Sequence, residues 1–169
     1  MQALQRHHRN ARLAQRERDT TELAVKRFER DVLAHRPTHV CIMFGLNDAW
    51  RPAADGPPLV ALDRYVANLK QMIGLLRERR ITPVLMTSNP FLTPASNVWL
   101  KPYIEACRKV ARDERVALVD LYGRFAELEI ETGNCRSLYS DDCHMNVEGN
   151  VFIADMLTAS LEHSLGAED

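Results

Sequence analysis

The chain has 169 residues, of which 46% are hydrophobic and 27% charged, and its formal net charge is −1. This length allows one domain with a substantial core, and the composition is that of an ordinary soluble globular protein. The near-neutral charge argues against a nucleic-acid binder, whose binding surface would be basic. No apolar stretch is long enough to span a membrane.

The first 18 residues differ in composition from the rest. They hold five arginines and a single acidic residue, Glu17, and they contain no glycine. We interpret residues 1–18 as a basic arm, helical or disordered, or as a replaced N-terminus, and residues 19–169 as the folded domain. This start lacks the apolar segment of a signal peptide, so the sequence as written predicts a cytoplasmic protein. An export signal could still be lost with an incomplete N-terminus.

Apolar periodicity predicts helices and strands that alternate along the remaining chain. Helices are expected near residues 19–34, 62–80, 103–111 and 147–165, with a short one near 123–130. Three apolar runs are expected to be strands, at residues 39–44, 83–87 and 116–120. Loops are expected at residues 51–58 and 88–97. Continuous apolar strands separated by long helices are typical of a parallel sheet with helices on both faces.

The chain has four cysteines, and none forms a C-x-x-C pair: Cys41, Cys107, Cys135 and Cys143. Cys41 falls in a strand that we expect to be buried, and Cys107 falls on the apolar side of a predicted helix. We interpret all four as free thiols in a reducing compartment.

A polar segment, Gly45-Leu46-Asn47-Asp48, directly follows the first predicted strand. Ligand sites of parallel sheets lie at the carboxyl ends of the strands. The Asn47 carboxamide could there stabilise an oxyanion, an effect worth roughly 3–4 kcal/mol per donor. Gly45 would allow a sharp turn or a close approach to a ligand, and Asp48 and Trp50 are candidate substrate contacts. The competing interpretation is that Asn47 and Asp48 form only a turn or a helix cap.

A second polar segment, Asp141-Asp142-Cys143-His144, precedes the last predicted helix. Asp141 and His144 are spaced so that both can face the same side of a tight turn. The carboxylate would then fix the tautomer of the imidazole and leave the other ring nitrogen free to act as a base. Asp142, only two residues from His144, is the weaker candidate. The competing interpretation is a solvated acidic pair beside an incidental histidine.

Two further interpretations of this segment are less favoured. Cys135, Asp141, Cys143 and His144 could form a metal site, but their spacing fits no common zinc pattern. Cys143 could be a nucleophile activated by His144, but adjacent residues in a loop rarely face each other. We therefore expect no metal ligand in this chain.

In this order, the two segments resemble two signature blocks of the SGNH (GDSL-type) esterase and lipase family. The block G-x-N-D matches residues 45–48 and the block D-x-x-H matches residues 141–144, with Asn146 and Gly149 fitting the segment that follows. The resemblance covers residues from about 19 to 165. It implies a flavodoxin-like three-layer α/β/α sandwich with a parallel sheet, from which the first strand or strands would be missing.

The resemblance also implies an activity, which is hydrolysis of carboxylic esters of small molecules without a metal or organic cofactor. His144 would be the general base, Asp141 its orienting carboxylate and Asn47 an oxyanion donor. However, no Gly-Asp-Ser segment occurs in the chain to supply the family's nucleophilic serine. Glu17 and Arg18 stand where the family's second-block glycine would be expected.

Two explanations for the missing blocks compete. In the first, the chain is a truncated or mis-started ester hydrolase, which would be impaired and prone to self-association through an unpaired sheet edge. Alternatively, it is a relative that has lost catalysis and serves as a ligand-binding or interaction domain. The unusual composition of residues 1–18 favours the first explanation.

Overall fold

The computed structural model describes residues 18–53 and 55–165. The basic arm expected at residues 1–18 therefore lies, except for Arg18, outside the described residues.

Three strands form a parallel sheet in the order β1-β2-β3. The strands are β1 (His39–Met43), β2 (Thr82–Met86) and β3 (Ala117–Val119). The register pairs Met43 with Met86 and Met86 with Val119, so the three carboxyl ends lie together at one edge of the sheet. The parallel sheet predicted from the continuous apolar runs is confirmed.

Helices connect and follow the strands. They are α2 (Thr21–Asp31), α3 (Leu46–Ala49), α4 (Leu62–Glu78), α5 (Pro94–Glu114), α6 (Leu121–Thr132) and α7 (Val147–Leu165), with two 3₁₀ turns, η2 (Leu33–His35) and η3 (Cys135–Leu138). The Thr20 side chain caps α2 by accepting a hydrogen bond from the backbone N–H of Leu23 at 3.4 Å, as its residue type predicts.

Helix α5 corrects the prediction of a loop at residues 88–97. It begins at Pro94, where the missing N–H of proline costs nothing because the first helical N–H groups have no intrahelical partner. Pro102 lies inside the helix. Because proline usually indicates a loop, the two prolines led to the prediction of a loop over the first part of this helix. The clear apolar repeat begins only at Tyr103.

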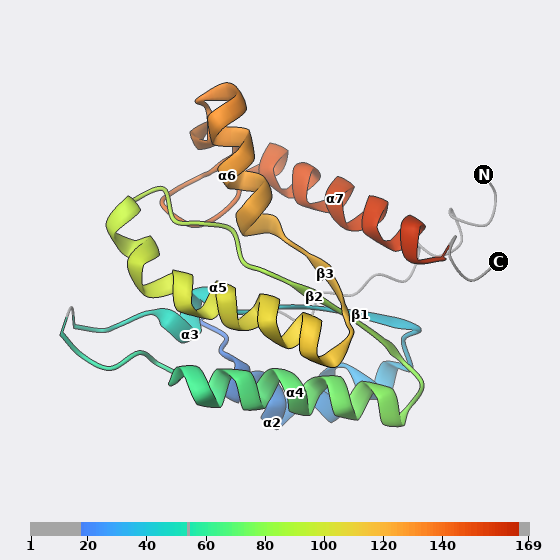
Figure 1. Cartoon of the computed structure of the whole chain (residues 1–169). Coiled ribbons are helices and arrows are strands. Elements are labelled where there is room, and N and C mark those ends of the chain that lie inside the picture. Colours follow the sequence, from blue (N-terminus) through green and yellow to red (C-terminus); the bar gives the residue numbers. More distant parts are fainter. Residues whose placement is uncertain (1–17, 54, 166–169) are drawn as a thin grey trace.

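The sheet lies between two helical layers (Figure 1). Helices α2, α4 and α5 cover one face, where Ile42 and Leu85 join the main core. Helix α7 covers the opposite face, where Val84 and Met86 pack against its apolar side chains, Ile153 among them. The expected three-layer α/β/α sandwich is therefore observed.

Helix α7 covers only part of its face of the sheet. Cys41 is in register with Val84, and Met43 with Met86, so these four side chains point to the α7 face. Val84 is 1% and Met86 4% exposed, whereas Met43 is 38% exposed and Cys41 is also exposed. The expectation that Cys41 is buried was therefore wrong, because among the described residues α7 packs over β2 and β3 and does not cover this face of β1.

Candidate active site

The segment after β1 turns sharply into the one-turn helix α3. Gly45 adopts φ +131°, a backbone conformation that side-chain-bearing residues rarely take. A Cβ atom at this position would lie 3.5 Å from Ser88 Oγ, so the turn also packs closely against the end of β2. The sharp turn expected at Gly45 is present, and it places Asn47 and Trp50 beyond the end of the strand.

Asn47 is partly exposed on α3. Its Nδ2 donates a hydrogen bond to the backbone oxygen of Asp19 at 2.9 Å. This bond uses one of the two N–H groups of the carboxamide and fixes the plane of the amide. The second N–H group is the one that could donate to an oxyanion.

Asp48 is buried, although we expected it to contact the substrate. It is 0% exposed, and its Oδ1 accepts hydrogen bonds from the backbone N–H of Thr21 at 3.0 Å and from Thr21 Oγ1 at 2.5 Å. Asn68 donates to the same hydroxyl oxygen at 3.0 Å. Asp48 thus fastens α3 to the start of α2, a supporting role that an exposed G-x-N-D segment would not suggest.

Burial raises the pKa of Asp48 above its ordinary value, although the bonds from Thr21 oppose the shift. A raised folded-state pKa means that the folded protein holds this proton more tightly than the unfolded chain does. The stability that it contributes is therefore present below about pH 4 and is lost as the pH rises through the folded-state pKa. We expect Asp48→Asn to flatten this part of the profile when the free energy of unfolding is measured in urea between pH 4 and pH 7. An unchanged profile in the variant would contradict the assignment.

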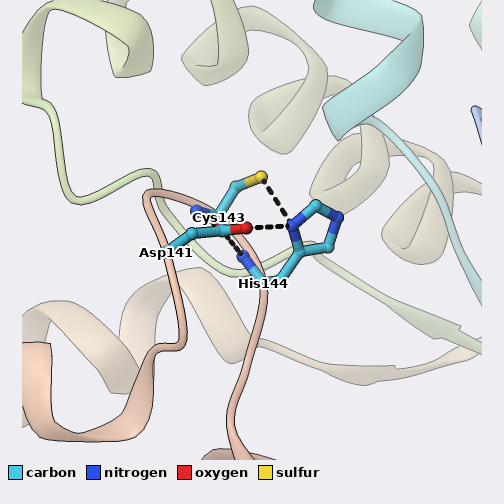
Figure 2. A group of neighbouring side chains, drawn as sticks. All are labelled: Asp141, Cys143 and His144. Carbon is cyan, nitrogen blue, oxygen red and sulfur yellow. Dashed lines mark hydrogen bonds and ion pairs between the residues drawn. The ribbon is translucent and has the colours of Figure 1, made fainter.

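Asp141 and His144 form a hydrogen-bonded pair in the loop between η3 and α7 (Figure 2). Asp141 Oδ2 lies 2.7 Å from His144 Nδ1. The other carboxylate oxygen accepts from the backbone N–H groups of Cys143 at 2.9 Å and of His144 at 2.8 Å. One carboxylate therefore closes the turn and orients the ring, which is the geometry that the D-x-x-H spacing predicts.

These three hydrogen bonds hold the pKa of Asp141 well below its ordinary range, the two backbone N–H groups contributing first. Asp141 is thus ionised at every pH at which esters are usually assayed. An ionised carboxylate at Nδ1 favours the tautomer with the proton on that nitrogen and leaves Nε2 as the acceptor. In Figure 2 the second ring nitrogen points away from both Asp141 and Cys143.

The segment after β2 holds this loop in place. Asn89 Nδ2 donates to the backbone oxygen of Cys143 at 2.9 Å. Asp142 accepts from the backbone N–H of Leu92 through its carbonyl at 2.8 Å and from that of Thr93 through Oδ1 at 2.7 Å. Sequence reasoning treated Asp142 only as a weaker partner for His144, and its anchoring role has no local signal because the residues that it binds lie about fifty positions away.

The two motifs lie at the same edge of the sheet. Asn47 follows β1, and Asn89, which binds the His144 loop, follows the neighbouring strand β2. A hollow of about 130 Å³ spans the two segments. Its lining residues are Ala49, Trp50, Phe91, Ser96, Trp99 and Asp142. Trp50, expected as a pocket residue, is among them, together with the aromatic residues of the 88–97 segment.

No described serine hydroxyl is hydrogen-bonded to the His144 ring. Ser88, at the end of β2, is 1% exposed and its Oγ has no partner among the described residues, so a substrate cannot reach it. Cys143 is also poorly placed for a nucleophile. Its Sγ lies 3.6 Å from Nδ1, the nitrogen that Asp141 occupies, and burial with the two nearby aspartates raises the thiol pKa to about 11.

A parallel α/β/α sandwich with an Asp-His pair and an amide at its strand ends has the arrangement of a hydrolytic enzyme. The chain belongs to the GDSL-like lipase/acylhydrolase family, whose model matches residues 2–151. This confirms the resemblance seen in the two sequence motifs.

Several relatives of known sequence are similar to this chain. The lipoprotein YqeF of Bacillus subtilis is 31% identical over 131 residues, which are 65% of this chain and 54% of that protein. The isoamyl acetate-hydrolyzing esterase 1 homolog of Rattus norvegicus is 30% identical, with 69% and 53% covered. The acetylxylan esterase of Geobacillus stearothermophilus is 28% identical, with 76% and 61% covered. The chain thus spans little more than half the length of these relatives.

Solved structures show the same fold. The acetyl xylan esterase AlAXEase superposes with a TM-score of 0.76 and 25% sequence identity, covering 85% of this chain and 76% of that one. The lipase/acylhydrolase from Enterococcus faecalis superposes with a TM-score of 0.72 at 22% identity, covering 87% and 72%. The second likeness concerns the fold alone.

Proposed function

We propose that the chain carries the base and oxyanion side of an active site for the hydrolysis of short-chain carboxylic esters. The observation that carries the proposal is the Asp141–His144 pair, joined at 2.7 Å and held beside an aromatic hollow at the carboxyl edge of the sheet. His144 is the general base, Asp141 orients it, and Asn47 donates to the oxyanion.

Each side chain has a defined task in this chemistry. Nε2 of His144 takes the proton of the attacking hydroxyl, and the adjacent Asp141 stabilises the imidazolium that results. The second N–H group of Asn47 stabilises the negative charge that develops on the carbonyl oxygen. His144 then returns its proton to the departing alcohol. The attacking serine is not assigned, because the chain contains no Gly-Asp-Ser segment.

The hollow supports a small acyl group. With a volume of about 130 Å³, it fits an acetyl group more closely than a long alkyl chain. Trp50, Phe91 and Trp99 supply apolar surface for the methyl end, and Ser96 supplies a polar atom. Two of the relatives are named for acetic esters, of xylan and of isoamyl alcohol, which agrees with this choice.

Intrinsic fluorescence tests the assignment without requiring turnover, because the chain has only two tryptophans and both line the hollow. We expect isoamyl acetate to change the emission saturably and isoamyl octanoate to leave it nearly unchanged. Ser96→Leu should abolish the response by filling the hollow, whereas Ser137→Leu, at an exposed position, should retain it. Equal responses to both esters, or no response to the acetate, would contradict the proposal.

The alternative function, a ligand-binding domain without catalysis, would use the same hollow but would not need the Asp141–His144 pair. We favour hydrolysis because that pair has the geometry of a base with its orienting carboxylate.

A reducing compartment remains part of the proposal, supported by four cysteines that are all unpaired. In the described part of the chain, no helix combines the length and apolarity that crossing a bilayer requires.

Self-association also belongs to the proposal. Among the described strands, β1 pairs on one side only, and Met43 and Cys41 on its uncovered face are exposed. An unpaired edge with apolar side chains favours contact with a second chain. Size-exclusion chromatography at two protein concentrations tests this, and a concentration-independent monomer would contradict it.

A further inference from the structure

We propose that Asp141, Cys143 and His144 form a binding site for Zn²⁺, which would take the place of the hydrogen bond between Asp141 and His144. Their spacing along the chain did not predict a metal site. The fold nevertheless brings one potential ligand atom of each residue within 4.8 Å of the others (Figure 2). Cys135 was the fourth candidate ligand considered in the sequence analysis. It lies elsewhere, and its Sγ donates a hydrogen bond to the backbone oxygen of Phe125 at 3.2 Å.

One separation between ligand atoms already matches a tetrahedral zinc site, and a second is shorter than such a site requires. Zinc bonds of about 2.3 Å to sulfur and about 2.0–2.1 Å to nitrogen place the two ligand atoms about 3.5 Å apart. Cys143 Sγ and His144 Nδ1 are already separated by 3.6 Å. Asp141 Oδ2 lies 2.7 Å from the same nitrogen, a separation that must lengthen by roughly half an ångström to admit the ion.

Hydrogen bonds hold the backbone of the turn that carries the three ligands. Asp141 Oδ1 is bound by the two backbone N–H groups at 2.9 and 2.8 Å, so Oδ2 is free to bind the metal once the histidine bond opens. Asn89 and Asp142 fasten the same loop to the segment after β2. The Asp141 and His144 side chains are 56% and 75% exposed, so an ion can enter and water can fill its fourth position.

Thiolate, imidazole and carboxylate are the ligand types that Zn²⁺ prefers in proteins. The negative charges of the neighbouring Asp141 and Asp142 attract a divalent cation. Binding would release the thiol proton and neutralise this local charge. The site is therefore better suited to zinc than to magnesium or calcium, which prefer oxygen ligands throughout.

Zinc bound here would switch off the base, a consequence that rests on the proposed function. A metal at Nδ1 displaces the proton from that nitrogen, and the neutral ring then carries its proton on Nε2. Nε2 can no longer accept the proton of an attacking hydroxyl. The same loop would thus alternate between a catalytic pair and an occupied metal site.

Cobalt substitution tests the site on the full chain, with Co²⁺ as the spectroscopic probe for Zn²⁺. We expect one equivalent of Co²⁺ to give a thiolate charge-transfer band in the near ultraviolet and visible bands of tetrahedral geometry, all removed by added Zn²⁺. Cys143→Ser should abolish the charge-transfer band, and Asp141→Asn should weaken binding by at least about 10-fold. Cys41→Ser, which removes an exposed cysteine outside the site, should leave the spectrum unchanged.

Cobalt bound without the thiolate band, or a band that survives in Cys143→Ser, would overturn the proposal. Nitrogen NMR of the imidazole provides a second test, since Zn²⁺ should shift His144 to the tautomer protonated at Nε2. Resonances of His144 that do not respond to Zn²⁺ would refute the site equally. Neither measurement depends on turnover or on ester binding. Failure of the zinc proposal and failure of the proposed function can therefore be told apart.

Discussion

Assayed as this 169-residue chain, the protein will hydrolyse p-nitrophenyl acetate roughly 10⁶-fold more slowly than an enzyme with a complete triad, the cost that removal of a triad serine typically carries. The expected cause is the missing nucleophile. The sequence contains no Gly-Asp-Ser, and no described serine hydroxyl is bonded to the His144 ring. A base and an oxyanion donor alone can still act on water, and they leave a residual advantage of about 10³–10⁴ over the uncatalysed reaction.

His144→Ala is the variant that interprets this measurement. We expect it to remove most of the residual turnover, because water would then lack a base. His39→Ala, which removes a partly exposed histidine at the opposite end of β1, is the matched control and should change nothing. Robust turnover that disappears in His144→Ala would contradict our expectation and would mean that a residue of this chain serves as the nucleophile.

If turnover is robust and depends on His144, the structure indicates a different candidate nucleophile from the one that the sequence suggests. From the sequence, Ser88 is the first serine to test, because it follows a strand. In the fold, Ser88 is 1% exposed and faces the turn at Gly45. Ser96 lines the hollow beside Asp142 and is therefore the better candidate. Ser96→Ala would be the next variant to measure.

The features predicted correctly from the sequence are those that depend on local pattern. Continuous apolar runs separated by helical patterns predicted the parallel sheet. Helix α7 was predicted with both of its ends. The D-x-x-H spacing gave the hydrogen bond between Asp141 and His144 because a short turn determines that geometry by itself.

The features that were missed depend on contacts between distant segments. The exposure of Cys41 follows from where α7 lies, and the burial of Asp48 follows from its bonds to Thr21. The approach of Cys143 Sγ to within 3.6 Å of His144 Nδ1 requires side-chain positions that their adjacency in the chain does not specify. Packing partners from elsewhere in the chain decide each of these outcomes, so a single sequence gives no direct signal for them.

Phe125 should be the residue whose loss most weakens the support of the His144 loop. It is 1% exposed on α6, and its ring makes edge contacts with Tyr139 at 5.6 Å and Phe152 at 5.4 Å between centroids. Tyr139 stands just before the Asp141–His144 turn, and Phe152 lies on α7 just after it. One aromatic side chain therefore connects the two ends of the loop to α6.

We expect Phe125→Ala to lower the free energy of unfolding by about 3–5 kcal/mol, the usual cost of emptying a large buried aromatic site. Amide hydrogen exchange at Cys143 and His144 should accelerate, because their N–H groups are protected by Asp141 only while the turn is held. Urea unfolding followed by circular dichroism measures the first effect, and exchange detected by NMR or mass spectrometry measures the second.

Two companion variants keep this prediction testable if Phe125→Ala fails to fold. Phe125→Leu retains most of the apolar volume and loses the two ring contacts, each worth about 0.5–1.5 kcal/mol beyond burial. Ile130→Ala changes an apolar residue of the same helix that is 87% exposed, and it should alter stability by less than about 0.5 kcal/mol. A Phe125→Leu protein as stable as the parent, with unchanged exchange at Cys143 and His144, would show that the aromatic contacts do not support the loop. In that case the bonds from Asn89 and to Asp142 would have to hold the His144 loop at the sheet edge on their own.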